Sequence, residues 1–540
     1  MSTIDRHDLV TGDGGLRNGI AVGLLTAALL TFLASWLVLF GQVGDGIDLL
    51  GVPLVDVLAL SLVVQGAGLG LLGLGSYYGY FPSNPSPSSG LLTGFLVGFL
   101  WTGTLGGIGS VQLGLGTIGW VGVAILGGIA AFVAVVLPSE DVGSTVPLAA
   151  LIAPLGLAIL VGPLSPPWVW EPNWTDAIFP GSEVLPLLFI AVSVVSAWSV
   201  AKAQEGFGAR GRQRGAYYLI GTSVAGMLGT LGLIIWFIVD NGHEVFLTGA
   251  EIGGLDGEFT IPFLGVTIPW LHVKLPFVTN VPGGLFVEIP GVWPAVLGTI
   301  WLVIGAVVVA VPLGIGSAIF LTEYVERGRI TQVVEVVTNG LWSTPSIVFG
   351  LFGLAFLMPR LSGGGRSLIV GQIVLGFMLL PLVMITSREA ILSVPDEYRD
   401  ASAALGVTRW QTIRSVVLPA AMPGVITGVI LGVGRIAGET APLLLVFGGP
   451  PFPSDNPAVM KSFEFSLQPP FITNEALTQA GTALPYQLYT SITAGVWNKE
   501  IYTTTEFGWG TALVLLGVVL LFYGIGVGGR MYFERKLSDR

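Results

Sequence analysis

Cysteine is absent from the 540-residue sequence, and histidine occurs only three times. Without cysteine the chain cannot form disulfides or use a thiolate as a nucleophile or metal ligand. His7, His243 and His272 stand far apart and give no HExxH or other metal-ligand spacing. We therefore expect no metal site.

Lysine is also scarce, and none of the five lysines follows a glycine. The sequence thus lacks the GxxxxGK[ST] loop whose backbone binds nucleotide phosphates. Two GxGxxG strings, beginning at Gly68 and Gly114, lie within apolar runs rather than after a strand, which favours close helix packing over nucleotide binding. If ATP drives a process in which this chain takes part, we expect another polypeptide to hydrolyse it.

Charged residues make up only 10% of the chain, whereas 52% is hydrophobic and the mean hydropathy is +0.82. Apolar runs near the roughly 20 residues that cross a bilayer recur along the sequence. They lie at about 19–40, 55–77, 91–108, 117–137, 146–164, 184–201, 216–239, 293–320, 331–358, 367–387, 421–447 and 510–530. These runs predict an all-α polytopic membrane protein with about twelve transmembrane helices. No cleavage pattern accompanies the first run, so we expect it to remain as a span.

Arginine and lysine cluster in loops on one side of the predicted spans. The clusters fall at 202–214, 327–329, 388–414 and 530–540. Because cytoplasmic loops retain positive charge, we expect this side and both termini to be cytoplasmic, in a cell (plasma) membrane. The long loops on the other side, about 241–292 and 448–509, are acidic and are expected to be extracytoplasmic.

A basic, glycine-rich stretch, KAQEGFGARGRQRG at 202–215, divides the chain. We interpret it as a cytoplasmic linker between an N-terminal six-helix membrane module at 1–201 and a C-terminal module at 216–540. The first module has scarcely any ionisable residue within a span, which favours a packing or anchoring bundle. Its role does not follow from the sequence.

The string RIAGETAP at 435–442 places Arg435 and Glu439 four residues apart inside an apolar span. A charge at the bilayer centre costs roughly 2.5 to 3.5 kcal/mol on insertion scales, so such a pair is a candidate ion site. Arg435 presents a planar fork of donors that matches an oxyanion, while Gly438 and Thr440 would offer close backbone approach and a hydroxyl. The alternative is a buried salt bridge that sets helix register.

The string STPS at 343–346 is a candidate second wall of the same path. Ser343, Thr344 and Ser346 carry hydroxyls beside Pro345, a helix breaker within an apolar run. The alternative is a proline kink whose freed carbonyls are satisfied by these hydroxyls.

The polar segment 395–419 separates two spans on the predicted cytoplasmic side. We expect it to form two short helices, a first that ends at Gly406 in a left-handed conformation and a second over 409–418. An ordinary amphipathic interfacial loop is the alternative. Upstream, the charged string at 323–329 is expected to form a solvated helix end.

This segment resembles the EAA loop of ABC importer permeases, whose pattern is Glu-Ala-Ala, three residues, Gly, nine residues, Ile, any residue, Leu-Pro. The matching residues are Asp400, Ala401, Ser402, Gly406, Val416, Leu418 and Pro419. Aspartate replaces the glutamate, serine the second alanine and valine the isoleucine. In that family the loop forms a coupling helix that fits a groove of the ATPase subunit, so the resemblance implies ATPase coupling here.

Three further strings make the C-terminal module similar to A-type permease subunits of phosphate-specific ABC importers, in the binding-protein-dependent transport permease family. They are VPLGIGSAIFLTEY at 311–324, STPSIVFGLF at 343–352 and RIAGETAPLLL at 435–445. The resemblance covers about 216–540 and leaves the N-terminal module outside it. It implies a type I permease domain that forms half of a phosphate pathway, with Arg435 and Glu439 in that pathway.

The same resemblance implies which components are on other chains. A partner ATPase dimer would bind ATP and Mg²⁺, and a related second permease subunit and an extracytoplasmic phosphate-binding protein would complete the importer. We expect no catalytic residue and no cofactor in this chain. The alternatives are a permease for molybdate, sulfate or phosphonate, and an intramembrane enzyme acting on a phospholipid or polyprenyl phosphate with Glu439 as base.

Overall fold

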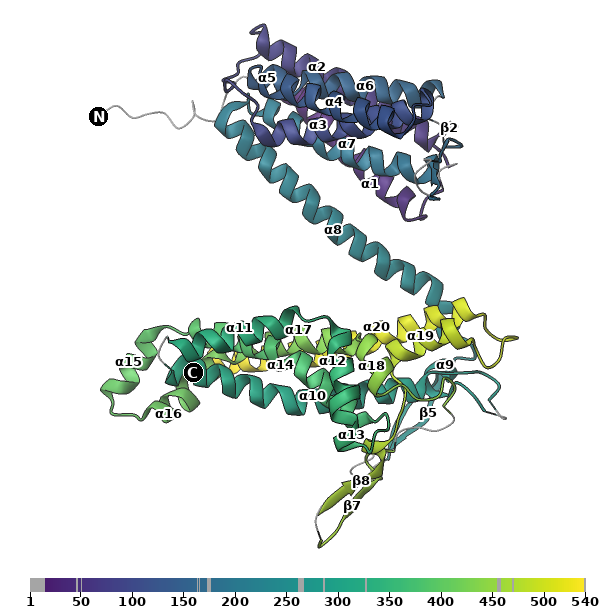
Figure 1. Cartoon of the computed structure of the whole chain (residues 1–540), viewed down its shortest axis with the longest axis vertical. Coiled ribbons are helices and arrows are strands. Elements are labelled where there is room, and N and C mark those ends of the chain that lie inside the picture. The colour runs from purple at the N-terminus through teal and green to yellow at the C-terminus, as the bar shows by residue number, and fades with distance from the viewer. Residues whose placement is uncertain are drawn as a thin grey trace. The chain divides into compact units, whose positions relative to one another are not determined.

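The computed structural model describes residues 15–538 apart from 45–46, 50, 163, 165, 172–175, 261–266, 285–286, 326–327, 454–457 and 469–470. Within these ranges, 11 helices are long and apolar enough to cross a membrane, or 12 if one sharply bent pair counts as a span. This confirms the predicted polytopic helical fold. The chain divides into two compact units, Met1–Ile234 and Ile235–Arg540, whose helices are labelled in Figure 1.

The N-terminal unit is a bundle of helices with two small hairpins in its loops. Its helices are α1 (Gly15–Leu39), α2 (Leu54–Tyr77), α3 (Leu91–Gly107), α4 (Thr117–Val136), α5 (Glu140–Gly143), α6 (Val146–Val161), α7 (Gly181–Gln204) and the first part of α8 (Gly208–Phe246). The hairpins pair β1 (Asp48–Leu49) with β2 (Val52–Pro53) and β3 (Val169–Trp170) with β4 (Phe179–Pro180).

Small residues let these helices pack closely. α2 lies against α6, α3 against α4 and α1 against α7. At the α2–α6 contact, a β-carbon on Gly66 would lie 2.7 Å from the backbone nitrogen of Ala153, so only glycine fits. A β-carbon on Gly68 would lie 2.6 Å from the end of the Leu24 side chain on α1, so this glycine also lies at a close helix contact. The glycine string that begins at Gly68 is therefore a helix-packing surface, as predicted.

The stretch 202–215, predicted as a linker, is helical except at 205–207. Gly206, Phe207 and Gly208 have φ angles of 75°, 63° and 68°, and these left-handed residues turn the chain from α7 into α8. The boundary between the two units falls within α8, after Ile234, and thus later than the predicted linker. The reason is that the stretch packs into the N-terminal unit, where Lys202 is only 1% exposed.

The C-terminal unit contains the end of α8 and a second set of helices. They are α9 (Pro276–Thr279), α10 (Trp293–Ile319), α11 (Arg329–Ser343), α12 (Ser346–Phe352), α13 (Met358–Leu361), α14 (Leu368–Leu392), α15 (Asp396–Ala404), α16 (Arg409–Thr412), α17 (Leu418–Ala437), α18 (Ala441–Val446), α19 (Leu484–Ala494) and α20 (Thr504–Ser538). α14 lies at the centre and packs against α10, α17, α11, α12 and α18. Leu302, Val374, Leu379 and Ile436 form part of the core between these helices.

Two features of this unit depart from a simple row of straight spans. The apolar run predicted as one span over 331–358 is bent by 102° between Ser343 and Ser346. The two loops expected to be extracytoplasmic contain hairpins, which pair β5 (Glu251–Thr260) with β6 (Thr267–Lys274) and β7 (Phe463–Phe465) with β8 (Ile472–Asn474). The helical prediction therefore holds for the spans, while the loops add short strands.

Candidate functional site

A break at 438–440 separates α17 from α18. Pro442 is the second residue of α18, and its missing N–H and fixed ring prevent α17 from continuing as one regular helix. Arg435 occupies the last turn of α17 and Glu439 lies in the break itself. The two candidate charges therefore lie at the end of a helix rather than in the middle of a regular span.

Arg435 and Glu439 form a loose ion pair. Nε of Arg435 lies 3.9 Å from Oε1 of Glu439, and their side chains are 39% and 18% exposed. The pair is thus not fully buried, and the 3.9 Å distance is too long for a hydrogen bond between these two atoms. Arginine suits an oxyanion because it stays charged and can bind two oxygens at once.

The guanidinium of Arg435 also lies over the ring of Trp342, 4.5 Å from its centroid. Trp342 belongs to α11 and immediately precedes Ser343, where the chain bends by 102° between α11 and α12. We call this bend the second helix break. An exposed cation–π contact of this kind contributes about 0.5–1 kcal/mol and restricts where the guanidinium points. Sequence reasoning missed Trp342, although an aromatic residue beside the STPS string was a visible signal.

Two hydroxyls of the STPS string form hydrogen bonds to the backbone at the second break. Ser343 Oγ donates to the carbonyl oxygen of Gly340 at 3.1 Å, and Thr344 Oγ1 donates to the same oxygen at 2.7 Å. A carbonyl at the end of α11 is thereby satisfied, which is the arrangement expected of a proline kink. With their hydrogens used in this way, the two hydroxyls have only oxygen lone pairs left to offer a ligand. Ser346 is the first residue of α12 and is partly exposed.

A close glycine contact holds the two breaks side by side. α12 packs against α18, and a β-carbon on Gly350 would lie 2.8 Å from Cα of Pro442. Gly438 shows no such contact, because a β-carbon there would meet only the carbonyl oxygen of Arg435, at 3.8 Å. The close backbone approach expected at Gly438 therefore does not occur within the described part of this chain. Thr440, in the same break, is partly exposed.

The predicted coupling loop forms α15 and α16. Gly406 has a φ of 72° after the end of α15, which confirms the left-handed conformation predicted there. Thr408 and Gln411 cap α16 by reciprocal hydrogen bonds. α16 does not end at Leu418 as expected, since a π-helical turn at Ile413–Val417 joins it to α17 in one helix of 29 residues.

The loop residues matched to the EAA pattern differ in exposure. Asp400, Ala401 and Gly406 are exposed, whereas Ser402 is buried and donates to the carbonyl oxygen of Tyr398 at 2.9 Å. Val416, Leu418 and Pro419 lie half-buried where the loop joins α17. Four large apolar side chains that the pattern does not include are also exposed on this loop, at Tyr398, Leu405, Val407 and Trp410.

The predicted solvated helix end at 323–329 is correct for Tyr324 and Arg329, which are exposed, and wrong for Glu323. It is only 6% exposed, and its Oε1 accepts a hydrogen bond from Nη2 of Arg399 at 2.9 Å. Arg399 also donates to the carbonyl oxygen of Val394 at 2.8 Å and to Oδ1 of Asp396 at 3.1 Å. Proximity to a helix end suggested solvent exposure, but the fold brings α15 over this carboxylate. Two other residues of that string, Glu326 and Arg327, lie outside the described residues.

The C-terminal unit is similar to known transport proteins. Residues 310–527 match the family described as binding-protein-dependent transport system inner membrane component. The probable ABC transporter permease protein YqgH of Bacillus subtilis (strain 168) is 42% identical over 164 residues, which are 29% of this chain and 52% of that protein. The chain thus spans about half the length of this curated relative.

Two further similarities cover more of this chain. A solved structure of the methionine ABC transporter MetNI in an inward-facing conformation matches 45% of this chain and 94% of that chain, with 19% identity and a TM-score of 0.33. The phosphate transport system permease protein PstA of Mycobacterium leprae (strain TN) is 34% identical over 248 residues, 46% of this chain and 73% of that protein. Given the extent of this second match, the chain belongs to the family of binding-protein-dependent transport system inner membrane components, together with the PstA permease protein.

Proposed function

We propose that this chain is the permease subunit of an ATP-driven importer of inorganic phosphate and forms half of the translocation pathway. One observation supports this most directly: the guanidinium of Arg435 is exposed at a helix break, flanked by Glu439 and the Trp342 ring. A guanidinium that stays charged and presents several N–H donors suits a tetrahedral oxyanion. The resemblance to PstA makes phosphate the first choice of oxyanion.

Glu439 supplies a basis for selectivity within this proposal. Monohydrogen phosphate carries a proton that a carboxylate can accept in a hydrogen bond, whereas fully ionised sulfate has none. When the pathway is empty, Glu439 would hold Arg435 through the 3.9 Å contact. When phosphate arrives, Arg435 would bind its oxygens and Glu439 its hydroxyl.

The other predicted pathway residues have supporting roles in this proposal. Ser343 and Thr344 stabilise the second break by donating hydrogen bonds to the carbonyl oxygen of Gly340. Ser346 in α12 and Thr440 in the first break offer partly exposed hydroxyls. Gly438 leaves the backbone of the first break uncovered.

Energy would come from a separate ATPase dimer that binds ATP and Mg²⁺. The coupling surface that we propose for it consists of the exposed residues Asp400, Ala401 and Gly406 together with the apolar side chains of Leu405 and Trp410. An exposed tryptophan such as Trp410 is a typical anchor of a protein interface, and a neighbouring exposed apolar side chain such as Leu405 enlarges the apolar patch. A related second permease subunit and an extracytoplasmic phosphate-binding protein would complete the assembly, with both termini of this chain on the cytoplasmic side.

Phosphate uptake by cells that express the full chain with its partner subunits tests the pathway. We expect Arg435→Gln to lower uptake of radiolabelled phosphate at least about tenfold at equal membrane abundance, because a hydrogen bond to a charged group is lost. Arg530→Gln is the matched control, since Arg530 also pairs with a glutamate four residues later, Glu534, at 2.7 Å but on α20.

The same assay distinguishes the cargo and can contradict the proposal. Uptake of sulfate or molybdate by the wild-type chain in place of phosphate would identify a different oxyanion permease. Full phosphate uptake by Arg435→Gln would show that the ion pair is only structural.

A further inference from the structure

A pocket lies between the end of α20 and the first part of the 29-residue helix that contains α17. Its volume is about 570 Å³, within the range of about 300–1,000 Å³ that is common for ligand sites. Two basic and four apolar side chains share its wall, and no carboxylate of a described residue lines it. The wall consists of Arg414, Ser415, Leu418, Pro419, Met422, Phe533 and Lys536.

The two helices run in opposite directions and pack closely just before they reach the pocket. A β-carbon on Gly526 of α20 would collide with the side chain of Ile430 on α17. About one turn farther along α20, Nη1 of Arg530 donates to Oγ1 of Thr427 at 3.3 Å. The pocket is the next step in the same direction, because residue numbers rise along α20 while they fall along α17. The close contact and the hydrogen bond therefore hold its two walls together.

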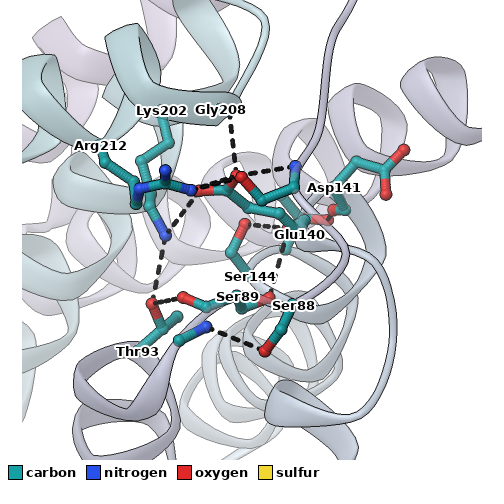
Figure 2. A network of polar contacts seen from close by, with 12 residues as sticks. Ser88, Ser89, Thr93, Glu140, Asp141, Ser144, Lys202, Gly208 and Arg212 are labelled. Carbon is teal, nitrogen blue, oxygen red and sulfur yellow. Dashed lines mark hydrogen bonds and ion pairs between the residues drawn. The ribbon is translucent and has the colours of Figure 1, made fainter.

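The two basic side chains of the pocket have no carboxylate partner, unlike others near the ends of spans. Lys202, in the last turn of α7, lies 3.5 Å from Glu140 in the polar network of Figure 2. Arg530, on α20 itself, pairs at 2.7 Å with the glutamate four residues later. Arg414 and Lys536 form no ion pair with any described residue, and both are exposed. Their charges are thus available to an anion that enters the pocket.

The position of the pocket along the helices places it at the edge of the membrane. Arg414 precedes the apolar run at about 421–447, and Lys536 follows the run at about 510–530. Both charges therefore lie beyond the hydrocarbon core, at the level of the lipid headgroups. Met422 stands at the beginning of the first run, so the apolar wall leads from the charges toward the hydrocarbon.

We propose that this pocket binds one anionic phospholipid. Arg414 and Lys536 contact the phosphate of its headgroup, since basic pockets between transmembrane helices suit anionic headgroups. Leu418, Met422 and Phe533 contact the glycerol and the upper part of the acyl chains. A free anion would gain nothing from this apolar wall, which is why a lipid is the better occupant. The inference does not depend on phosphate being the cargo of the chain.

Photocrosslinking of the purified full chain in nanodiscs tests the site. The nanodiscs would consist of phosphatidylcholine with a rising fraction of phosphatidylglycerol that carries a diazirine near the top of one acyl chain. Peptide mass spectrometry would locate the adduct, which we expect in the segments around Met422 and Phe533. A phosphatidylcholine with the same diazirine measures the reaction with a neutral lipid, and its equal yield in all proteins shows that the variants keep their fold.

Two double variants separate the pocket from the general charge of this surface. Arg414→Gln/Lys536→Gln removes both pocket cations, whereas Arg409→Gln/Arg535→Gln removes two cations from the same two helices outside the pocket. A basic residue near the membrane surface contributes about 1 kcal/mol to binding an anionic lipid, or about fivefold. We therefore expect the first variant to need at least about tenfold more phosphatidylglycerol for half-maximal adduct, and the control to stay within about twofold of wild type.

Three results would overturn the proposal. The half-maximal fraction of phosphatidylglycerol could be equal in all three proteins, or the neutral lipid could form the same adduct with equal yield. The third result is loss of the adduct in millimolar inorganic phosphate but not in sodium chloride of equal ionic strength, which would make the pocket a site for a free anion. Retention of the adduct in phosphate supports the lipid.

Discussion

The guanidinium of Arg435 stands 4.5 Å from the centroid of the Trp342 ring, so a cation in the last turn of α17 is positioned by an aromatic residue at the end of α11. Each of these residues borders a helix break, so the contact between them links the two breaks. Any movement of α11 relative to α17 would therefore change where the guanidinium points. This relationship makes Trp342 a positioning residue for the proposed phosphate site.

Replacing Trp342 should weaken phosphate binding without abolishing transport. Loss of an exposed cation–π contact costs about 0.5–1 kcal/mol, so we expect Trp342→Leu to raise the KM for phosphate uptake about two- to fivefold with little change in maximal rate. Trp342→Phe retains a ring and should lie closer to wild type. Identical KM values for all three proteins would contradict a role for the ring in holding Arg435.

Glu323 should matter more than its position at a helix end suggests. We expect Glu323→Gln to destabilise the loop around α15 by about 1.5–3 kcal/mol, because the hydrogen bonds from Arg399 lose their charged acceptor. In the assembled transporter, ATP hydrolysis would then drive less phosphate uptake per ATP. Asp396→Asn is the control, since Asp396 contacts the same Arg399 but is 92% exposed. Equal ATP cost of uptake in both variants would argue against a role of the buried pair in coupling.

Gly298 on α10 should not tolerate a side chain. A β-carbon there would lie 1.8 Å from the carbonyl oxygen of Thr482, so Gly298→Ala should cost about 1–3 kcal/mol through overpacking. Gly316→Ala on the same helix meets no atom within 4 Å and should be neutral or slightly stabilising. Thermal unfolding of the two purified variants in detergent is the measurement, and equal midpoints would show that α10 can move away from Thr482.

Gly406 should require a residue that accepts a left-handed backbone. At a φ of 72°, an alanine would destabilise the folded backbone by roughly 1–2 kcal/mol, whereas asparagine adopts this conformation more readily. No atom crowds the position, so the effect would be conformational rather than steric. We expect Gly406→Ala to lower phosphate uptake and Gly406→Asn to retain more of it at equal abundance. More uptake by Gly406→Ala than by Gly406→Asn would show that contact with a partner protein, and not the backbone φ, determines which residue is accepted at this position.

Much of the fold could be predicted because its causes are local. Hydropathy identified the spans, since a bilayer-length apolar segment needs no information about its neighbours. The same holds for the left-handed Gly406 and for the disruption of the helix around Pro345, which depend on single residues and their immediate surroundings. The 102° size of that bend was not predictable, because it depends on how α12 packs against α18.

The candidate site was only partly visible in the sequence. Arg435 and Glu439 stand out because charge is rare in an apolar run, and their spacing puts them within reach of each other on any helix. Their roles in transport remain predictions. Trp342 stands beside the STPS string, but nothing in the sequence indicates that its ring meets Arg435, because that contact depends on how α11 packs near α17.

By itself, the sequence determined that this chain is a polytopic helical membrane protein and which charges stand in apolar surroundings. Only the tertiary structure decided which distant groups meet: Trp342 with Arg435, Arg399 with Glu323, and Lys202 with Glu140. The physical reason is that hydropathy and backbone preference act over a few residues, whereas an ion pair or ring contact forms between whichever side chains helix packing brings together.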